Sequence, residues 1–170
     1  CVSESTEIIV AVGYKAEQVK SYINTIFPKR KIKFVLVDNY DKPGSGPGLS
    51  LLKCKKYLES PFIFTSADTI LKESNIFEGL NENWMGVSHV EVKESSKYCL
   101  VYDHIDKKGN KYLNKLYFGE GNLAYVGAAG IYNYASFWDS LESKRFFRFE
   151  NPTMGNHDEY QVLDGFDGLK

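Results

Sequence analysis

Short apolar runs alternate with a segment of helical periodicity in the first part of the chain. Residues 7–12 are mostly apolar and β-branched, which predicts a strand of a parallel sheet. Residues 15–26 carry apolar side chains at helical spacing, and Pro28 ends that helix. Residues 32–37 predict a second strand. A strand, a helix and a strand in this order predict a right-handed βαβ unit.

A second apolar stretch, residues 61–70, begins with an aromatic run and ends on one acid, Asp68. The run predicts a strand buried on both faces, as in a parallel sheet. A carboxylate just past its C-terminal end lies where open α/β sheets bind their ligands. Asp68 can then be a hard-metal ligand that faces a nucleotide phosphate. It can equally form an Asx-turn or cap the next helix, and the residues alone leave both interpretations open.

Between these strands, residues 38–48 are punctuated by glycine and proline and predict a loop that leads into a helix over residues 49–58. Such a loop before a helix offers backbone N–H groups and a positive dipole end to a base, a ribose or a phosphate. It matches neither the P-loop pattern nor the dinucleotide-binding pattern. Glycines that only permit tight turns are the alternative explanation.

The second half of the chain predicts more antiparallel pairing. The polar residues 106–110, with Gly109, indicate a hairpin between two strands. Glycines and alanines at residues 127–130 let a ligand or another backbone segment approach a strand closely. The expected elements are a short helix over 76–81, strands over 84–92, 99–104, 112–118 and 124–134, a helix that begins near Ser136, and a last helix from Glu159.

The composition of the chain narrows the classes of protein to which it can belong. The chain has 170 residues, of which 43% are hydrophobic and 15% aromatic, so we expect one folded domain over residues 1–170. The formal net charge of −1 disfavours a nucleic-acid partner, and no apolar run approaches the ~20 residues of a membrane span. The cysteines and histidines lack metal-ligand or disulfide spacing, which favours reduced thiols in a cytoplasm. A buried strand follows Cys1 almost directly, so we expect that sequence upstream is missing. The last helix, which begins at Glu159, is expected to be cut short near Lys170.

Five segments in this order resemble the sugar-nucleotidyltransferases, also called NDP-sugar pyrophosphorylases. They resemble, in turn, the family's second strand and following helix, its nucleotide-base loop, its Gly-Asp segment, its sugar-pocket strand and its Glu-x-Gln helix. Ala67 stands where the family usually has glycine. The five segments are residues 9–26, 39–51, 66–69, 127–132 and 159–163.

The resemblance implies a three-layer α/β/α fold, GT-A-like and Rossmann-like, with a mixed, mostly parallel central sheet and an antiparallel portion on the acceptor side. It implies a nucleotidyltransferase that joins a nucleoside triphosphate to a phosphorylated sugar or a similar phosphorylated alcohol and releases pyrophosphate. Such an enzyme would make nucleotide sugars in the cytoplasm, for capsular or other surface polysaccharide. No membrane partner is implied, and self-association into a homo-oligomer is left open.

The family's functional residues map onto few positions. Asp68 would be the catalytic residue and would hold Mg²⁺ against the α-phosphate. Gly130 and Glu159 would contact the acceptor. The positions expected to bind the nucleotide are Tyr40, Gly46, Pro47, Gly48 and Asp68.

The chain also departs from the family pattern. The glycine-rich loop with its catalytic Arg, and the Lys that meets the phosphates, cannot be located, and neither Asp164 nor Asp167 is assigned as a second metal ligand. We therefore expect these residues alone to have little activity. A non-catalytic, nucleotide-sugar-binding regulatory domain is one alternative. A GT-A glycosyltransferase is another, although Ile70 stands where such enzymes carry the second acid of Asp-x-Asp.

Overall fold

The computed structural model describes residues 2–70, 80–109, 111–150 and 159–169, the side chains of 145–150 excepted. The chain divides into two compact units, each described here by itself. The first unit comprises Cys1–Ser60 and Tyr134–Leu169, and the second comprises Pro61–Asn133. The single domain expected over the whole chain stays a prediction.

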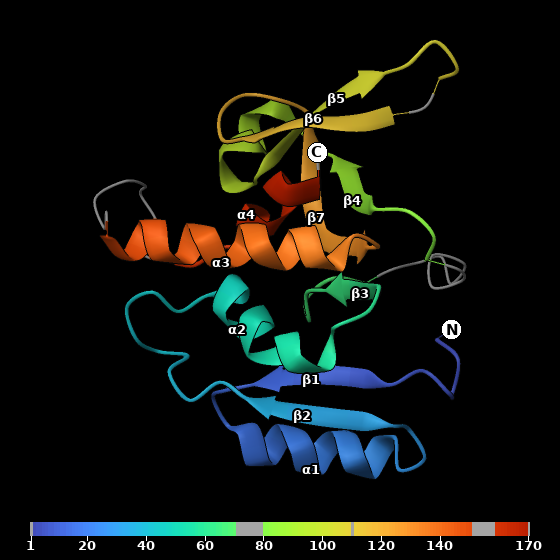
Figure 1. Ribbon diagram of the computed structural model, residues 1–170, viewed down its shortest axis with the longest axis vertical. Coiled ribbons are helices and arrows are strands. Elements are labelled where there is room, and N and C mark those ends of the chain that lie inside the picture. Colours follow the sequence, from blue (N-terminus) through green and yellow to red (C-terminus); the bar gives the residue numbers. More distant parts are fainter. Residues whose placement is uncertain (1, 71–79, 110, 151–158, 170) are drawn as a thin grey trace. The chain divides into compact units, whose positions relative to one another are not determined.

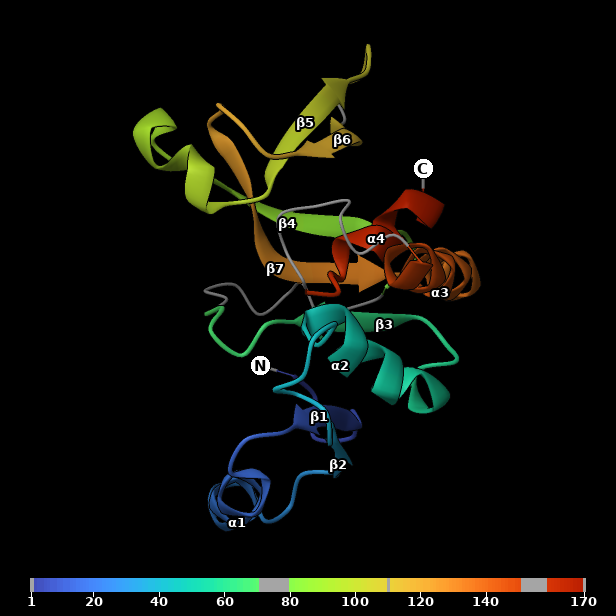
Figure 2. The same cartoon turned by 90° about the vertical axis from the view of Figure 1, so that its left-hand side faces the viewer.

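The first unit begins with the predicted βαβ arrangement. Strands β1 (Ile8–Val12) and β2 (Ile32–Leu36) pair in parallel, from Ile8 opposite Ile32 to Val12 opposite Leu36. Helix α1 (Ala16–Ile26) connects them and runs along one side of the pair (Figures 1 and 2). The predicted βαβ unit is therefore confirmed, with element bounds within one residue of those expected.

The remaining helices of the first unit follow the predicted pattern at α2 and α3 and depart from it at the C-terminal end. The region predicted as one helix over residues 49–58 is α2 (Pro47–Cys54) followed by the 3-10 turn η1 (Lys55–Tyr57). Helix α3 spans Tyr134–Glu150 and so begins two residues before Ser136. The last helix, α4 (Leu163–Phe166), continues into η4 (Asp167–Leu169). The prediction that it begins at Glu159 is wrong.

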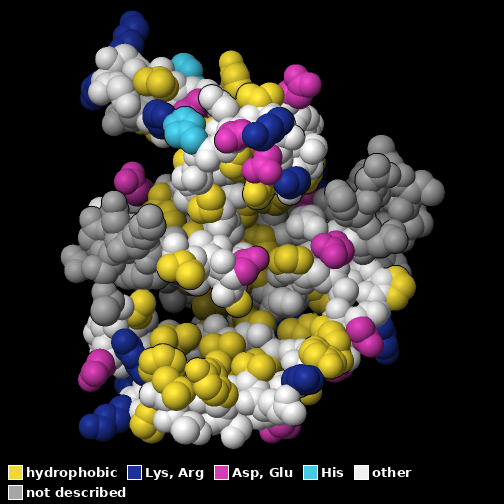
Figure 3. Space-filling model, turned by 180° about the vertical axis from the view of Figure 1, so that it is seen from behind, with side chains coloured by type: hydrophobic (Ala, Val, Ile, Leu, Met, Phe, Trp, Pro, Cys, Tyr) yellow, Lys and Arg dark blue, Asp and Glu magenta, His cyan; other side chains and the backbone are white. Residues whose placement is uncertain are grey.

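The core of the first unit lies among β1, β2, α2, α3 and the C-terminal segment. Helix α1 contributes no buried residue to it, although its apolar side chains have the predicted spacing. Hydrophobic side chains accordingly gather on the surface at the lower end of Figure 3, over the part formed by β1, β2 and α1. The buried apolar residues of this unit are Val12, Val35, Val37, Leu49, Leu51, Cys54, Phe137, Trp138, Leu141, Tyr160, Val162 and Phe166.

The described residues of the second unit form a five-stranded sheet, and the strand pairs seen among them are antiparallel. The strand order is β3-β7-β5-β6, and β4 also pairs with β7. The predicted hairpin between β5 and β6 is confirmed. A 3-10 segment, η3 (Val92–Lys97), which the sequence pattern did not predict, lies between β4 and β5. The strands are β3 (Phe62–Thr65), β4 (Trp84–His89), β5 (Leu100–Ile105), β6 (Lys111–Tyr117) and β7 (Leu123–Ile131).

The pairing of β3 among the described strands does not confirm the mostly parallel sheet that we expected. Phe62 lies opposite Ile131 and Thr65 opposite Ala128 in an antiparallel pair, so the described pairing of this strand is not the parallel one expected. Among the described strands only β1 and β2 run parallel. The reason is physical: a continuous apolar run predicts that a strand is buried, and burial alone does not fix the direction of its neighbour.

Residues 76–79 of the expected short helix over 76–81 lie outside the described residues, and residues 80 and 81 are not helical. Of the helices that the structure describes, none is both long and apolar enough to cross a membrane.

Candidate functional site

Asp68 lies at the tip of a short turn that follows β3. The Thr69 N–H donates to the Ser66 carbonyl over 3.2 Å, which closes the turn. At its start, the Ser66 N–H donates to the Gly127 carbonyl over 2.8 Å. At its end, the Thr69 hydroxyl donates to the Val126 carbonyl over 2.7 Å. Hydrogen bonds on both sides of Asp68 therefore fix the turn to β7, while the Asp68 side chain itself is exposed.

The carboxylate of Asp68 has no hydrogen bond or ion pair with any residue that the structure describes. The Asx-turn alternative requires the Ile70 N–H to donate to this carboxylate, and that bond is not formed. The alternative in which Asp68 caps a helix concerns residues 71–79, which lie outside the described part. No described residue thus occupies either carboxylate oxygen, and both can accept a ligand.

This arrangement fits a magnesium ion that is shared with a substrate. Mg²⁺ in phosphoryl-transfer sites is held by one or two carboxylates and by substrate phosphates, and water completes the octahedron. A magnesium ion at this place would have one hard oxygen ligand from the exposed Asp68 carboxylate, which lies on an anchored turn. Within residues 2–70, 80–109, 111–150 and 159–169, no group of three or more His, Cys, Asp or Glu side chains could hold a metal ion.

The two late acids that the sequence leaves unassigned have structural contacts in the first unit. The main-chain carbonyl of Asp164 accepts a hydrogen bond from the Ser140 hydroxyl over 2.8 Å. The carboxylate of Asp167 lies 3.8 Å from the Lys144 ammonium in an ion pair. These contacts join the C-terminal segment to α3 and supply no reason to assign either acid to a metal.

The small residues of β7 admit parts of the same unit. Gly130 lies opposite Trp84, and a Cβ atom at Gly130 would overlap the Trp84 indole ring. Gly127 has a left-handed φ of 78°, and a Cβ atom there would lie 2.5 Å from the Ser66 hydroxyl. The predicted close approach is therefore real, and in this structure the approaching groups are the indole of β4 and the turn that carries Asp68.

The glycines of the 44–48 loop likewise admit the chain itself. A Cβ atom at Gly46 would lie 2.6 Å from the Tyr160 carbonyl oxygen, and one at Gly48 would lie 2.8 Å from the same atom. The Gly48 N–H donates to that oxygen over 2.8 Å, and the Tyr160 N–H donates to the Ser45 carbonyl over 2.9 Å. The main chain around Tyr160 thus occupies the space into which a side chain at Gly46 or Gly48 would project. Pro47, the other loop residue expected to bind it, is exposed as the first residue of α2.

Glu159 lies beside this contact, in a bend four residues ahead of α4. Its Cβ atom is 3.3 Å from the position that a Cβ atom would take at Gly46, and its carboxylate accepts a hydrogen bond from the Gln161 amide over 3.3 Å. The structure therefore brings together Glu159 and Gly46, which the resemblance assigned to the acceptor and to the nucleotide. Glu159 is exposed, and its position comes from the contact of its segment with the loop.

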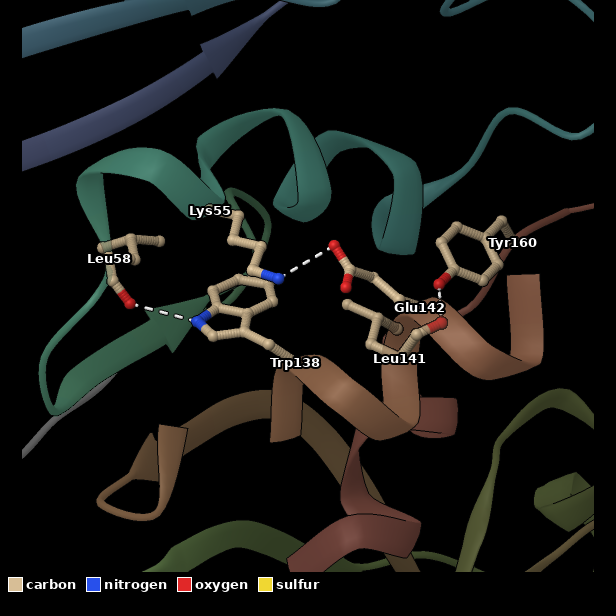
Figure 4. Close-up of polar contacts among 6 residues, drawn as sticks. All are labelled: Lys55, Leu58, Trp138, Leu141, Glu142 and Tyr160. Carbon is tan, nitrogen blue, oxygen red and sulfur yellow. Dashed lines mark hydrogen bonds and ion pairs between the residues drawn. The ribbon is translucent and has the colours of Figure 1, made fainter. Parts of the chain in front are cut away.

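Helix α3 holds this part of the first unit in place, as Figure 4 shows. The Tyr160 hydroxyl donates to the Leu141 carbonyl, and the Trp138 indole N–H donates to the Leu58 carbonyl over 3.1 Å. Buried bonds of this kind contribute about 1 kcal/mol each. The ion pair of Lys55 with Glu142, at 2.9 Å, is partly exposed and contributes roughly 0–1 kcal/mol.

At the C-terminal ends of β1 and β2, two tyrosines lie close together. The ring centroids of Tyr14 and Tyr40 are 6.3 Å apart, with an angle of 60° between the ring planes. The Lys15 ammonium lies 5.3 Å from the centroid of the Tyr14 ring. Tyr40 was predicted from the sequence; Tyr14 and Lys15 were not. The Gly-Tyr step directly after a predicted strand was the available signal for Tyr14.

The pKa values of Cys54, Cys99 and Asp38 are shifted, and each shift has a structural cause. Burial raises the pKa of the Cys54 thiol to about 11, and burial also raises the pKa of the Cys99 thiol to about 11, so neither is an activated nucleophile. His89 and His104 are exposed on the second unit, and His157 lies outside the described residues. A hydrogen bond from Lys53 holds the pKa of Asp38 below its usual value.

Comparison with known proteins identifies a fold. No protein-family model matches the sequence, and no curated protein matches it. The crystal structure of UDP-glucose pyrophosphorylase complexed with UDP-glucose superposes with a TM-score of 0.60 at 15% sequence identity, over 94% of this chain and 67% of that one. The structure of apo UDP-glucose pyrophosphorylase superposes with a TM-score of 0.62 at 16% identity, over 94% of this chain and 68% of that one.

These similarities show a mixed α/β fold that is similar, at a coarse level, to that of a sugar nucleotidyltransferase. At such low identity the likeness concerns the fold alone, because one fold supports many unrelated activities. The function must therefore be argued from the residues described above.

Proposed function

We propose that this chain belongs to a nucleotidyltransferase that joins a nucleoside triphosphate to a phosphorylated sugar, or to a similar phosphorylated alcohol, and releases pyrophosphate. The observation that carries the proposal is the exposed Asp68 carboxylate, which the described residues leave unpaired on a turn that two hydrogen bonds fix to β7. The coarse similarity of the fold to UDP-glucose pyrophosphorylase supports the same class of reaction.

The proposed reaction is an in-line displacement. A phosphate oxygen of the acceptor attacks the α-phosphorus, the bond from that phosphorus to the oxygen bridging to the β-phosphate breaks, and pyrophosphate leaves with the electron pair. The protein supplies positioning and charge neutralisation rather than a covalent intermediate. A magnesium ion at Asp68 would neutralise the charge on the phosphate oxygens.

The finer assignments belong to the same proposal. Tyr40 and Pro47 are exposed and suit contact with the nucleotide. Gly46 and Gly48 would contact the nucleotide through main-chain atoms that Tyr160 leaves uncovered. Gly130 would contact the acceptor through main-chain atoms that Trp84 leaves uncovered. Glu159 is exposed and suits the acceptor. The three-layer architecture, the cytoplasmic location and the role in surface polysaccharide rest on the family resemblance and complete the proposal.

The test is a substitution of Asp68 in the full-length protein. Pyrophosphate release is measured with each nucleoside triphosphate against several phosphorylated sugars and alcohols, with Mg²⁺ and with EDTA. Asp68→Ala should lower magnesium-dependent turnover by about 10²-fold or more, because a charge-neutralising group at the transferred phosphorus contributes several kcal/mol. The melting temperature should stay near that of the wild type, since an exposed, unpaired carboxylate contributes within about 0.5 kcal/mol to stability.

Glu82→Ala is the matched control, because Glu82 is also an exposed acid in a loop of the second unit. It should leave turnover unchanged. If Asp68→Ala turns over at the wild-type rate, the metal role is wrong. If the wild-type protein binds nucleotide sugar but releases no pyrophosphate with any pair of substrates, the protein is the regulatory binding domain instead.

A further inference from the structure

Two exposed tyrosine rings and one lysine lie together where β1 and β2 end. The Tyr14 side chain is 68% exposed and that of Tyr40 is 43% exposed, although each is large and mostly apolar. Each follows the C-terminal end of its strand, and the strands are parallel neighbours. Ligands of α/β sheets bind beyond the carboxyl ends of parallel strands. The aromatic pair therefore lies at a ligand-binding edge.

Close packing fixes the Tyr40 ring at this position. A Cβ atom at Gly13 would lie 2.8–2.9 Å from atoms of the Tyr40 side chain, so only glycine allows the ring to lie on the main chain there. The two rings are tilted by 60°, and a flat group stacked on one ring would meet the edge of the other. The pair thus forms a corner of two aromatic surfaces, of which the Tyr40 ring is held by close packing.

The ammonium group of Lys15 lies beside this corner, and its position requires an unfavourable backbone conformation. Lys15 has a φ of 53°, and it is the only non-glycine residue with positive φ in the part of the chain that the structure describes. A left-handed conformation disfavours a lysine relative to glycine. The resulting position puts its ammonium over the Tyr14 ring. Next to Tyr40, the buried amide oxygen of Asn39 has no hydrogen-bond partner among the described residues.

We infer that Tyr14 and Tyr40 form a stacking site for the base of a nucleoside triphosphate, and that Lys15 contacts its phosphates. This inference rests on the proposed function and adds Tyr14 and Lys15 to it. An aromatic face binds any base, and a lysine beside it attracts the negative charge of a nucleotide. An apolar protein partner would gain nothing from the charge of Lys15, whereas a nucleotide uses both the rings and the cation.

The experiment measures nucleotide binding to the full-length protein by calorimetry, with ATP, CTP, GTP, UTP and dTTP in the presence of Mg²⁺. Tyr14→Ala should weaken the binding of whichever nucleotide the wild type binds by about tenfold, the usual loss when a stacking ring is removed. Tyr14→Phe keeps the ring and should change the affinity by less than about twofold on the same basis. Tyr22→Ala is the matched control, because Tyr22 is 67% exposed in the same unit and lies on α1 away from the strand ends.

The contribution of the Lys15 charge to binding can be tested with a variant that does not destabilise the fold. Lys15→Gly removes the charge and suits the left-handed backbone, so its melting temperature should equal or exceed that of the wild type. It should weaken the binding of inorganic tripolyphosphate as well as that of the nucleotide, whereas Tyr14→Ala should weaken only the nucleotide. Lys15→Arg retains the charge and should restore binding.

A measurement on the wild-type protein tests the stacking site without any substitution. Bound nucleotide should protect Tyr14 from nitration by tetranitromethane and leave Tyr22 reactive. If the wild type binds a nucleotide but Tyr14→Ala binds it as well as Tyr22→Ala does, or if Tyr14 stays reactive in the complex, the stacking site is refuted and the proposed function stands. If the wild type binds none of the five nucleotides, the proposed function and the stacking site both fail.

Discussion

Glycines in the 44–48 loop and in strand β7 both allow a close approach, but the groups that approach them differ. In the loop, main-chain atoms of Tyr160 approach Gly46 and Gly48. In β7, the indole of Trp84 lies over Gly130. Both regions were expected to admit a ligand, and in both the described structure shows that part of the chain makes the close approach.

The difference lies in how far each neighbour can move aside. A main-chain carbonyl that is hydrogen-bonded on the loop cannot shift without loss of that bond, whereas an indole ring can rotate about its side-chain torsions. The glycine pattern in a sequence thus predicts close approach but not what approaches. The nature of the neighbour then decides how much a larger residue costs.

The largest effect is expected at Gly46. Gly46→Ala adds a Cβ atom 2.6 Å from the Tyr160 carbonyl oxygen, at a φ of 142° that favours glycine. We expect a loss of about 3 kcal/mol in the free energy of unfolding, from overpacking and backbone strain together. Urea denaturation monitored by circular dichroism measures it.

Gly44→Ala is the control within the same loop. Gly44 has a φ of 77°, but a Cβ atom there would meet nothing within 4 Å. Backbone strain alone should cost about 1 kcal/mol. Equal losses for the two variants would show that the Tyr160 main chain does not occupy the space next to Gly46.

A smaller effect is expected at Gly130, because its neighbour is a side chain. Gly130→Ala should cost roughly 1–3 kcal/mol as the Trp84 indole is displaced. Trp84→Leu should cost a similar amount through lost burial. The double variant should be less destabilised than the sum of the two by at least about 0.5 kcal/mol, since the smaller leucine makes room for the methyl group. Strict additivity of the two losses in urea denaturation would contradict the contact.

Local patterns predicted the elements of the fold well and the pairing of its strands poorly. The βαβ unit follows from the periods of residues 7–37, and the β5–β6 hairpin follows from a polar segment with Gly109, because both signals are local. The antiparallel direction of β3 (Phe62–Thr65) depends on its pairing with β7 (Leu123–Ile131), a segment much later in the chain. No local pattern in residues 61–70 carries that information.

The candidate site was predictable in part for the same reason. The position of Asp68 on a turn after β3 follows from the apolar run that precedes it, while its role as a ligand stays a prediction. The cover over Gly46 by the Tyr160 main chain could not be foreseen, because it joins segments over 100 residues apart in the sequence. The left-handed conformation of Lys15 could not be predicted from the sequence either, since lysine rarely adopts it.

The smallest effect tests the support behind the loop contact. Tyr160→Phe removes the hydroxyl that donates to the Leu141 carbonyl and leaves the aromatic ring in place. Because a buried hydrogen bond of this kind contributes about 1 kcal/mol, the free energy of unfolding should fall by about that amount. Tyr22→Phe, at an exposed tyrosine of the same unit, should change it by less than about 0.5 kcal/mol. If the two variants unfold at the same urea concentration, the Tyr160 hydroxyl contributes nothing to stability.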